Sequence, residues 1–349
     1  MRAVSAPVLL ATMWSAPALA AESFFKDRTL TILVGYSAGS SYDAYARLLG
    51  RHFAKHIPGA PNIIVKNMPG SSSIKASNYV YNVAPKNGLT IGAVRNGMGI
   101  EQLYGRKSVR FDALKFNWLG SLTRSYPACT IWATAPATTL EAIKKTEVVS
   151  GAIGITASLA MYPRALNEMI GTRFKVVTGY SSTGVLHAME RGEVHARCGG
   201  GYDGLVATRP HWFAEKKIKI LAMMSNTRHP DLKDAPWIFD FVKDPTDVKT
   251  LQFIFSTQEW GRPYMAPPGV PVARVAMLRR AFAKTMVDPA LLADGKRMRM
   301  TLRGPLTGEA MQKLIAQYHK TPKAIIERVK QFQKRPTGEK RIKRKKKKK

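Results

Sequence analysis

The chain has 349 residues, 45% of them hydrophobic, and a formal net charge of +32 at pH 7. A chain of this length and hydrophobic content is expected to fold into two domains of ordinary size, which excludes an intrinsically disordered protein. No segment approaches the roughly 20 uninterrupted apolar residues of a membrane span, so we expect the mature protein to be soluble rather than membrane-spanning.

The N-terminus is typical of a secretory signal peptide, which we place at residues 1–20. Arg2 gives it a basic start, residues 8–14 form an apolar stretch, and Ala18, Leu19 and Ala20 give the small-residue pattern of a cleavage site. The sequence therefore predicts export, with cleavage near Ala20.

Cys129 and Cys198 are the two cysteines of the chain. The oxidising compartment that export implies permits a disulfide between them. No C-x-x-C spacing indicates a redox motif or a zinc site. The sequence leaves two possibilities open, one bridge or two buried thiols.

The positive charge is concentrated at the C-terminus, where residues 334–349 hold eleven Lys and Arg against one acid, Glu339. A run of like charges repels itself and cannot bury apolar area, so we expect a disordered basic tail. Attraction to anionic lipid or nucleic acid is an alternative role for the tail. Because the protein is expected to be exported, we expect no specific nucleic-acid partner. The remaining surplus of charge favours the capture of anionic ligands.

The first third of the chain repeats a strand, a loop and a helix. The β-branched run TLTILVG (29–35) predicts a buried strand, and apolar residues recur at helical spacing over 42–53. The same order then repeats as strand, loop, helix and strand over 62–67, 68–72, 73–84 and 89–94.

The middle of the chain continues this order of elements. Strand, loop and helix follow one another twice, over 148–154, 155–158 and 159–170, and again over 174–180, 181–184 and 185–192. A further strand is predicted over 218–224, and helices over 272–286 and 307–331. Strands that alternate with helices predict an α/β fold with parallel, helix-covered sheets.

Four loops between a predicted strand and a predicted helix share one chemistry, being small and rich in Gly and hydroxyl groups. They read GYSAGSSYD, PGSSS, GITAS and GYSSTG. Such a loop presents backbone N–H groups, the positive end of a helix dipole and hydroxyls at one point, which suits an oxyanion. Together they predict a cradle for a carboxylate or a phosphate. Each hydroxyl can also serve as a plain helix N-cap.

The first of these loops also fits G-x-S-x-G, the nucleophile elbow of α/β-hydrolases, with Ser37 as the nucleophile. Only one strand precedes it, whereas the elbow usually lies several strands into a sheet. His319 is the late histidine that a triad would require, and no Asp stands out as its partner. A serine hydrolase is therefore one alternative to a solute-binding protein, and a basic protein that binds nucleic acid or an anionic surface is the other.

Metal and cofactor motifs are missing from the sequence. The seven His show no H-E-x-x-H or H-x-H spacing, and neither a phosphate-binding P-loop nor a G-x-G-x-x-G after a strand occurs. We expect no metal and no cofactor.

The stretch LTILVGYSAGSSYDAYARLLGRHF resembles the opening of the receptor proteins of tripartite tricarboxylate transporters, the Bug family of periplasmic binding proteins. The matching residues are Ala38, Gly39, Asp43, Ala46 and Arg47 there, and Asn67, Pro69, Gly70, Gly88 and Thr90 in the next two stretches. Later stretches, from GAIGITAS to GRPYMAPPGVPVARVAMLRRAF, resemble the remaining family landmarks in order. The resemblance covers nearly the whole mature chain.

This resemblance implies a two-lobed, periplasmic-binding-protein-like (type II) fold, each lobe a mixed, mostly parallel sheet flanked by helices. We expect lobe 1 to comprise residues 24–124 and 227–331, lobe 2 residues 125–226, and the basic tail residues 334–349. It also implies a monomeric periplasmic receptor that closes around a small organic carboxylate, catalyses no reaction, and delivers its ligand to the membrane subunits of a tripartite transporter.

The ligand-binding residues that the resemblance implies come from both lobes. Lobe 1 would supply Tyr36, Ser37, Ala38, Ser40, Ser41, Asp43, Ser71 and Ser72, and lobe 2 would supply Thr156, Ala157, Ser158, Tyr180, Ser181 and Ser182. Asp43 is expected chiefly to hold its loop by hydrogen bonds, with a direct ligand contact as the alternative.

Two departures from the family pattern bear on the ligand. Glycines that follow Pro69-Gly70 in the family are replaced by Ser71, Ser72 and Ser73, and two acids are lost in the stretch from Gly192 to Gly199. The loss of the second of these acids, at Gly199, predicts a shift toward more anionic ligands.

Overall fold

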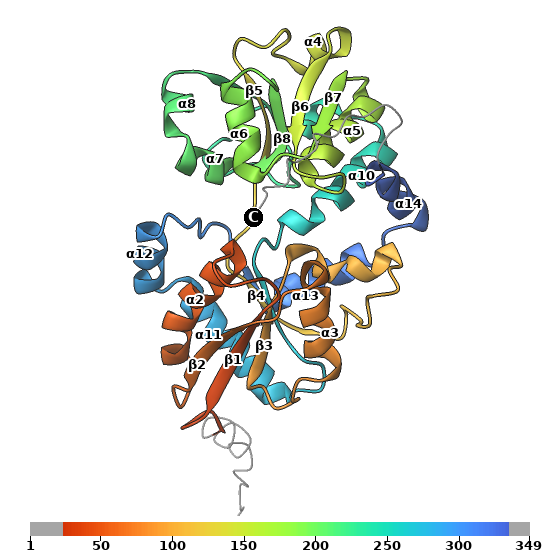
Figure 1. Ribbon diagram of the computed structural model, residues 1–349. Helices are drawn as coiled ribbons and strands as arrows, with labels where there is room; N and C mark the ends of the chain where they lie inside the picture. The colour runs from red at the N-terminus through yellow and green to blue at the C-terminus, as the bar shows by residue number, and fades with distance from the viewer. Residues whose placement is uncertain (1–23, 335–349) are drawn as a thin grey trace, which may run out of the picture.

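The computed structural model describes residues 24–334, which form two mixed sheets flanked by helices, one above the other (Figure 1). We call the part built on the six-stranded sheet lobe 1 and the part built on the five-stranded sheet lobe 2. The expected signal peptide and all but the first residue of the expected basic tail lie outside the described residues.

Lobe 1 is built on a sheet of order β11-β4-β10-β3-β1-β2. β1 pairs in parallel with β2 and β3, because the helices between them return the chain to the same edge. The strands are β1 (Thr29–Val34), β2 (Asn62–Asn67), β3 (Thr90–Ala93), β4 (Asn117–Ser121), β10 (Pro263–Ala266) and β11 (Leu306–Thr307).

The helices of lobe 1 pack apolar faces on both sides of this sheet. α2, for example, buries Tyr45, Ala46, Leu49 and Phe53, which follow the helical spacing read from the sequence. The helices are α2 (Ser41–Phe53), α3 (Ile74–Asn82), α11 (Val272–Met286), α12 (Pro289–Arg297) and α13 (Gly308–Tyr318), with 3₁₀ turns η1 (Ala54–His56), η2 (Ser71–Ser73), η3 (Asn96–Gly99) and η4 (Glu101–Tyr104).

Lobe 2 is built on a sheet of order β7-β6-β8-β5-β9. Its strands are β5 (Pro127–Trp132), β6 (Val148–Ala152), β7 (Phe174–Thr178), β8 (Ala196–Gly201) and β9 (Ile218–Met223). Its helices are α4 (Leu140–Lys145), α5 (Ser158–Ile170), α6 (Ser182–Glu190), α7 (Tyr202–Thr208) and α8 (Pro210–Ala214). The expected α/β fold with two mixed sheets is confirmed.

Each sheet is mixed, as expected, and contains strands that run against the majority: β10 runs antiparallel to β3 and β4, and β5 runs antiparallel to β8 and β9. These strands follow a crossing between the lobes and so enter their sheets in the opposite direction. The single helix expected over 307–331 is divided, because Pro322 cannot continue it, and α14 (Lys323–Phe332) starts after a break.

The remaining elements, α9 (Ile238–Phe241), α10 (Pro245–Phe255) and η5 (Ser256–Gln258), follow β9. α10 packs along α14, which also contacts α5 of lobe 2 (Figure 1). One cluster of buried apolar side chains thus runs from lobe 1 through these helices into lobe 2. The lobe boundaries remain a prediction, because α14 contacts η4 of lobe 1 as well as α5 of lobe 2.

Two segments that cross between the lobes lie side by side. Gly261 N–H donates to Thr123 O (2.8 Å) and Ser125 N–H donates to Gln258 O (2.8 Å), which ties residues 122–125 to residues 258–262. In lobe 2, a disulfide joins the paired positions Cys129 on β5 and Cys198 on β8. Within residues 24–334 no helix is long and apolar enough to cross a membrane.

Candidate functional site

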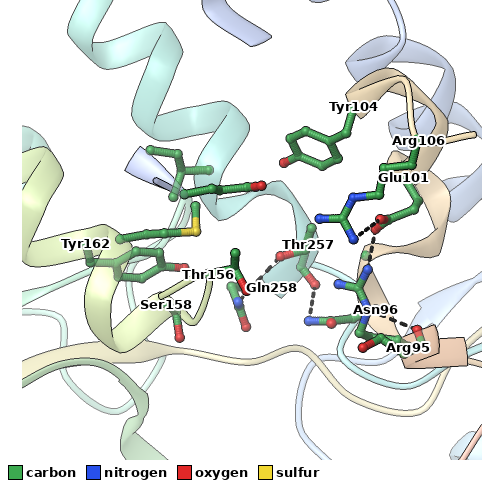
Figure 2. A pocket seen from close by; sticks show the side chains of 15 residues that line it. Arg95, Asn96, Glu101, Tyr104, Arg106, Thr156, Ser158, Tyr162, Thr257 and Gln258 are labelled. Atoms are coloured by element: carbon green, nitrogen blue, oxygen red, sulfur yellow. Dashed lines mark hydrogen bonds and ion pairs between the residues drawn. The ribbon is translucent and has the colours of Figure 1, made fainter. Parts of the chain in front are cut away.

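A cavity of about 330 Å³ lies between loops of both lobes (Figure 2). Lobe 1 contributes the ends of the loops after β2 and β3 and the turn η4, and lobe 2 contributes the start of α5. The end of α10 and η5 close the space between them. Its lining residues are Ser72, Arg95, Asn96, Gly97, Glu101, Tyr104, Arg106, Thr156, Ser158, Met161, Tyr162, Ile254, Thr257, Gln258 and Gln333.

The charged group of this cavity is one buried carboxylate between two guanidiniums. Glu101 is 2% exposed, and it pairs with Arg95 through Oε2 and with Arg106 through Oε1 at 3.1 Å. Arg95 Nε also donates to Ser72 O (3.3 Å). Because two positive groups face one negative group, this wall carries a surplus positive charge that favours an anionic ligand.

The lobe 2 wall is held by a close approach between β8 and α5. The Ser158 hydroxyl donates to Gly199 O (2.9 Å). A Cβ on Gly199 would meet Tyr162 Cδ2 at 2.7 Å and the Ser158 backbone at 3.0 Å, and its φ of +97° is one that favours glycine. At this position, where the family pattern has an acid, α5 leaves no room for any side chain.

Burial shapes the titration of the two tyrosines in the cavity wall. Desolvation, reinforced by the negative charge of Glu101, raises the pKa of Tyr104 to about 12. Desolvation also raises the pKa of Tyr162 far above its ordinary value. Both hydroxyls thus stay protonated at neutral pH, so each can donate a hydrogen bond.

Asp43 holds the loop after β1 by hydrogen bonds and does not line the cavity. The Asp43 carboxylate is 3% exposed and accepts hydrogen bonds from Gly39 N–H (2.9 Å), Arg47 Nε (3.0 Å) and Asn67 Nδ2 (2.9 Å). Burial acts to raise the pKa of Asp43, but these hydrogen bonds outweigh it and hold the pKa below its usual value. Asp43 thus holds its loop as expected, and a direct ligand contact stays a prediction.

The loop after β2 has three serines with backbone angles that usually require glycine. Ser71, Ser72 and Ser73 have φ values of 44°, 50° and 78°. The Ser73 hydroxyl donates to Gly35 O (3.2 Å) and accepts from Arg95 N–H (3.2 Å). The serines therefore keep the glycine-type backbone, and one of their hydroxyls fixes the neighbouring loop and Arg95.

Of the fourteen residues predicted to bind ligand, Ser72, Thr156 and Ser158 line this cavity. Ser40 and Ser181 act as N-caps of α2 and α6, accepting from Asp43 N–H and Gly184 N–H. The other predicted residues do not line it, and their ligand contacts stay predictions. These are Tyr36, Ser37, Ala38, Ser41, Asp43, Ser71, Ala157, Tyr180 and Ser182, together with the two caps.

Sequence reasoning missed the charged half of the cavity. Arg95 and Asn96 directly follow the predicted strand 89–94, so the rule that placed the other loops at strand ends could have included them. Thr257 and Gln258 gave no sequence signal, because only the return of the chain from α10 brings them to the site. Asn96 Nδ2 donates to Thr257 O (2.8 Å), which links the two segments (Figure 2).

The hydrolase alternative finds no support in the geometry. His319 Nε2 lies 2.8 Å from Gly99 O, and among the residues described here no hydrogen bond links Ser37 Oγ to a histidine. Residues 24–334 also hold no cluster of three His, Cys, Asp or Glu that could bind a metal ion.

Comparison with known proteins gives relatives and a fold. No family model matches the chain. A UPF0065 protein of Bordetella bronchiseptica is 26% identical over 292 residues, covering 82% of this chain and 80% of its own length. The chain is a homologue of the UPF0065 proteins. The Bug-family resemblance read from the sequence is confirmed at this level.

Solved structures agree on the fold. A TctC solute-binding protein from Polaromonas has a TM-score of 0.67 at 21% identity, covering 86% of this chain and 98% of its own. MatC from Rhodopseudomonas palustris, solved with bound malate, has a TM-score of 0.55 at 20% identity, covering 88% of this chain and 99% of its own. The chain therefore has the two-domain fold of these solute-binding proteins.

Proposed function

We propose that this protein is a periplasmic receptor that captures a small organic carboxylate between its lobes and catalyses no reaction. The observation that carries the proposal is the surplus positive charge around Glu101 in a cavity lined by both lobes. The malate bound to the similarly folded MatC supports this class of ligand. The proposed receptor is a monomer that is exported to the periplasm, where it delivers its ligand to the membrane subunits of a tripartite transporter.

The lining groups suit a carboxylate. Arg95 presents a planar, permanently charged guanidinium, which matches the geometry of a carboxylate. Ser72 on lobe 1 and Ser158 on lobe 2 add hydroxyls at the same cavity. A ligand that contacts both lobes binds the closed arrangement best, and so it shifts the population of conformations toward closure.

Arg95 provides the direct test. Arg95→Gln removes one of the two positive groups, while Arg106 remains as the partner of Glu101. We expect this variant to bind carboxylates at least tenfold more weakly, as truncation of a charged hydrogen-bonding partner typically does. Arg110→Gln changes the net charge equally at an exposed site and should bind as the wild type does.

The measurement is a thermal-shift screen of the mature protein at constant ionic strength, followed by calorimetric titration. The panel should contain dicarboxylates, tricarboxylates, aromatic acids and amino acids, because a ligand at about a hundred times its Kd stabilises the fold by about 2.7 kcal/mol. A wild-type protein that no carboxylate stabilises would refute the proposal. Labelling of Ser37 by a fluorophosphonate would favour the hydrolase instead.

A further inference from the structure

A second cavity, of about 260 Å³, lies where the two crossing segments meet α2 and α7. Its wall includes Tyr45 of α2, Arg124 and Arg262 of the crossing segments, and Asp203 of α7. Both lobes therefore contribute to it, as they do to the first cavity.

Arg262 is fixed in position but keeps an unused donor. Its guanidinium lies over the rings of Tyr42 (4.4 Å) and Tyr45 (4.7 Å). Nη1 donates to Gly261 O (2.7 Å) and Nη2 to Ser41 Oγ (2.8 Å), while Nε is buried without a partner. Stacking and two hydrogen bonds thus hold a permanent positive charge at the cavity wall.

Arg124 lines the same cavity and, like Arg262, has no carboxylate partner in the described part of the chain. Its Nη1 donates a long hydrogen bond to Thr227 Oγ1 (3.4 Å), and its Nε is also buried without a partner. Throughout residues 24–334, neither Arg124 nor Arg262 forms an ion pair with a carboxylate. Each guanidinium thus keeps a permanent positive charge that no carboxylate within this range offsets, so an anion in the cavity would be attracted by both.

The acid in this cavity wall is already engaged. Asp203 Oδ1 lies 3.4 Å from Arg303 Nε and 3.2 Å from Nε2 of His229, which is 1% exposed. Asp231 N–H donates to His229 Nδ1 (3.1 Å), which leaves the proton of a neutral imidazole on Nε2, facing Asp203. Asp203 therefore does not neutralise Arg124 and Arg262.

We infer that this cavity is a second subsite for a carboxylate group, held between Arg124 and Arg262. The inference rests on the proposed function and extends it to ligands with more than one carboxylate. Tyr42 contacts residues of both cavities: its ring lies under Arg262, and its hydroxyl accepts a hydrogen bond from the N–H of Asn96 (3.2 Å), which lines the first cavity. The group bound here is the distal carboxylate of one dicarboxylate or the carboxylate of a second monocarboxylate.

Calorimetric titration of the mature protein with dicarboxylates of increasing length, from malonate to adipate, and with butyrate tests the inference. The variants are Arg124→Met and Arg262→Met, with Arg124→Lys as the conservative change and exposed Arg110→Met as the control of equal charge. Far-UV circular dichroism and the unfolding midpoint establish that each variant is folded; if Arg262→Met does not fold, Arg124→Met alone decides.

For one bridging ligand, Arg124→Met should weaken the best dicarboxylate at least tenfold and leave butyrate unchanged, with Arg124→Lys in between. For two separate ligands, the stoichiometry of butyrate should fall from two to one. Arg124→Met with the affinity and stoichiometry of the control overturns the inference, while Arg95→Gln still tests the first cavity. A wild-type protein that binds no carboxylate overturns the proposed function as well.

Discussion

Replacing Gly199 by alanine tests the close approach of β8 to α5 that shapes the lobe 2 wall. The new Cβ would lie 2.7 Å from Tyr162 Cδ2 and 3.0 Å from the Ser158 carbonyl group, and both distances are below van der Waals contact. The carbonyl belongs to the backbone of α5, so it cannot move away as the end of a flexible side chain could. The substitution must therefore shift the helix or the strand.

The expected cost has two parts. A Cβ at φ +97° in a left-handed conformation costs about 1 kcal/mol, and overpacking a close contact costs about 1–3 kcal/mol more. The sum, about 2–4 kcal/mol, should lower the unfolding midpoint by about 4–8 °C, taking about 2 °C per kcal/mol for a chain of this size.

Calorimetry or urea denaturation of the mature protein measures this loss. Gly154→Ala is the matched control, because no atom lies within 4 Å of its Cβ position and its backbone is not left-handed, so its stability should change by less than about 0.5 kcal/mol. Since Ser158 and Tyr162 line the first cavity, Gly199→Ala should also weaken carboxylate binding. A Gly199→Ala protein as stable as the control would show that the contact is not as close as described.

Three further outcomes are expected. Ser71→Gly should stabilise the protein by up to about 1 kcal/mol in urea denaturation, because φ of 44° suits glycine, whereas Ser37→Gly should not stabilise it. The hydrogen bonds that keep the pKa of Asp43 below its unfolded value stabilise the fold above about pH 4, and this stability is lost as the pH falls through the folded pKa, so Asp43→Asn should flatten the fall in unfolding midpoint between about pH 5 and 3. Thiol titration of the denatured protein should find no free thiol without reductant and two with it, from Cys129 and Cys198; two thiols without reductant would contradict the disulfide.

The local elements could be predicted because their signals are local. The strand at 29–35 and the helix at 42–53 follow from apolar spacing, and the structure has them as β1 and α2. The antiparallel strands could not be read in the same way, because the direction in which β10 enters its sheet depends on how the chain returns from lobe 2. Pro322 indicates a helix break that could have been predicted from the sequence. It was missed because the apolar spacing continues on both sides of the proline.

The hydroxyl-rich loops were predictable as loops but not as parts of one site. Ser72 and Ser158 line the same cavity, whereas the Ser181 side chain caps the N-terminus of α6. A hydroxyl at a helix start serves either role, and the sequence contains nothing that separates them. Arg95 could have been included because it follows a predicted strand, but its ion pair with Glu101 could not be predicted, because only the fold places the two side chains together.

The two departures from the family pattern have opposite structural consequences. At Ser71, Ser72 and Ser73 the backbone keeps the left-handed angles of glycine, and the Ser73 hydroxyl supports the loop on Gly35 and Arg95. At Gly199 the loss of an acid lets α5 approach β8 so closely that no side chain fits. The first change adds hydrogen-bonding groups to the lobe 1 wall, and the second leaves lobe 2 without a negative charge at that point. We expect both changes to make the space between the lobes more favourable to an anion, so a ligand with more than one carboxylate is the one to test first.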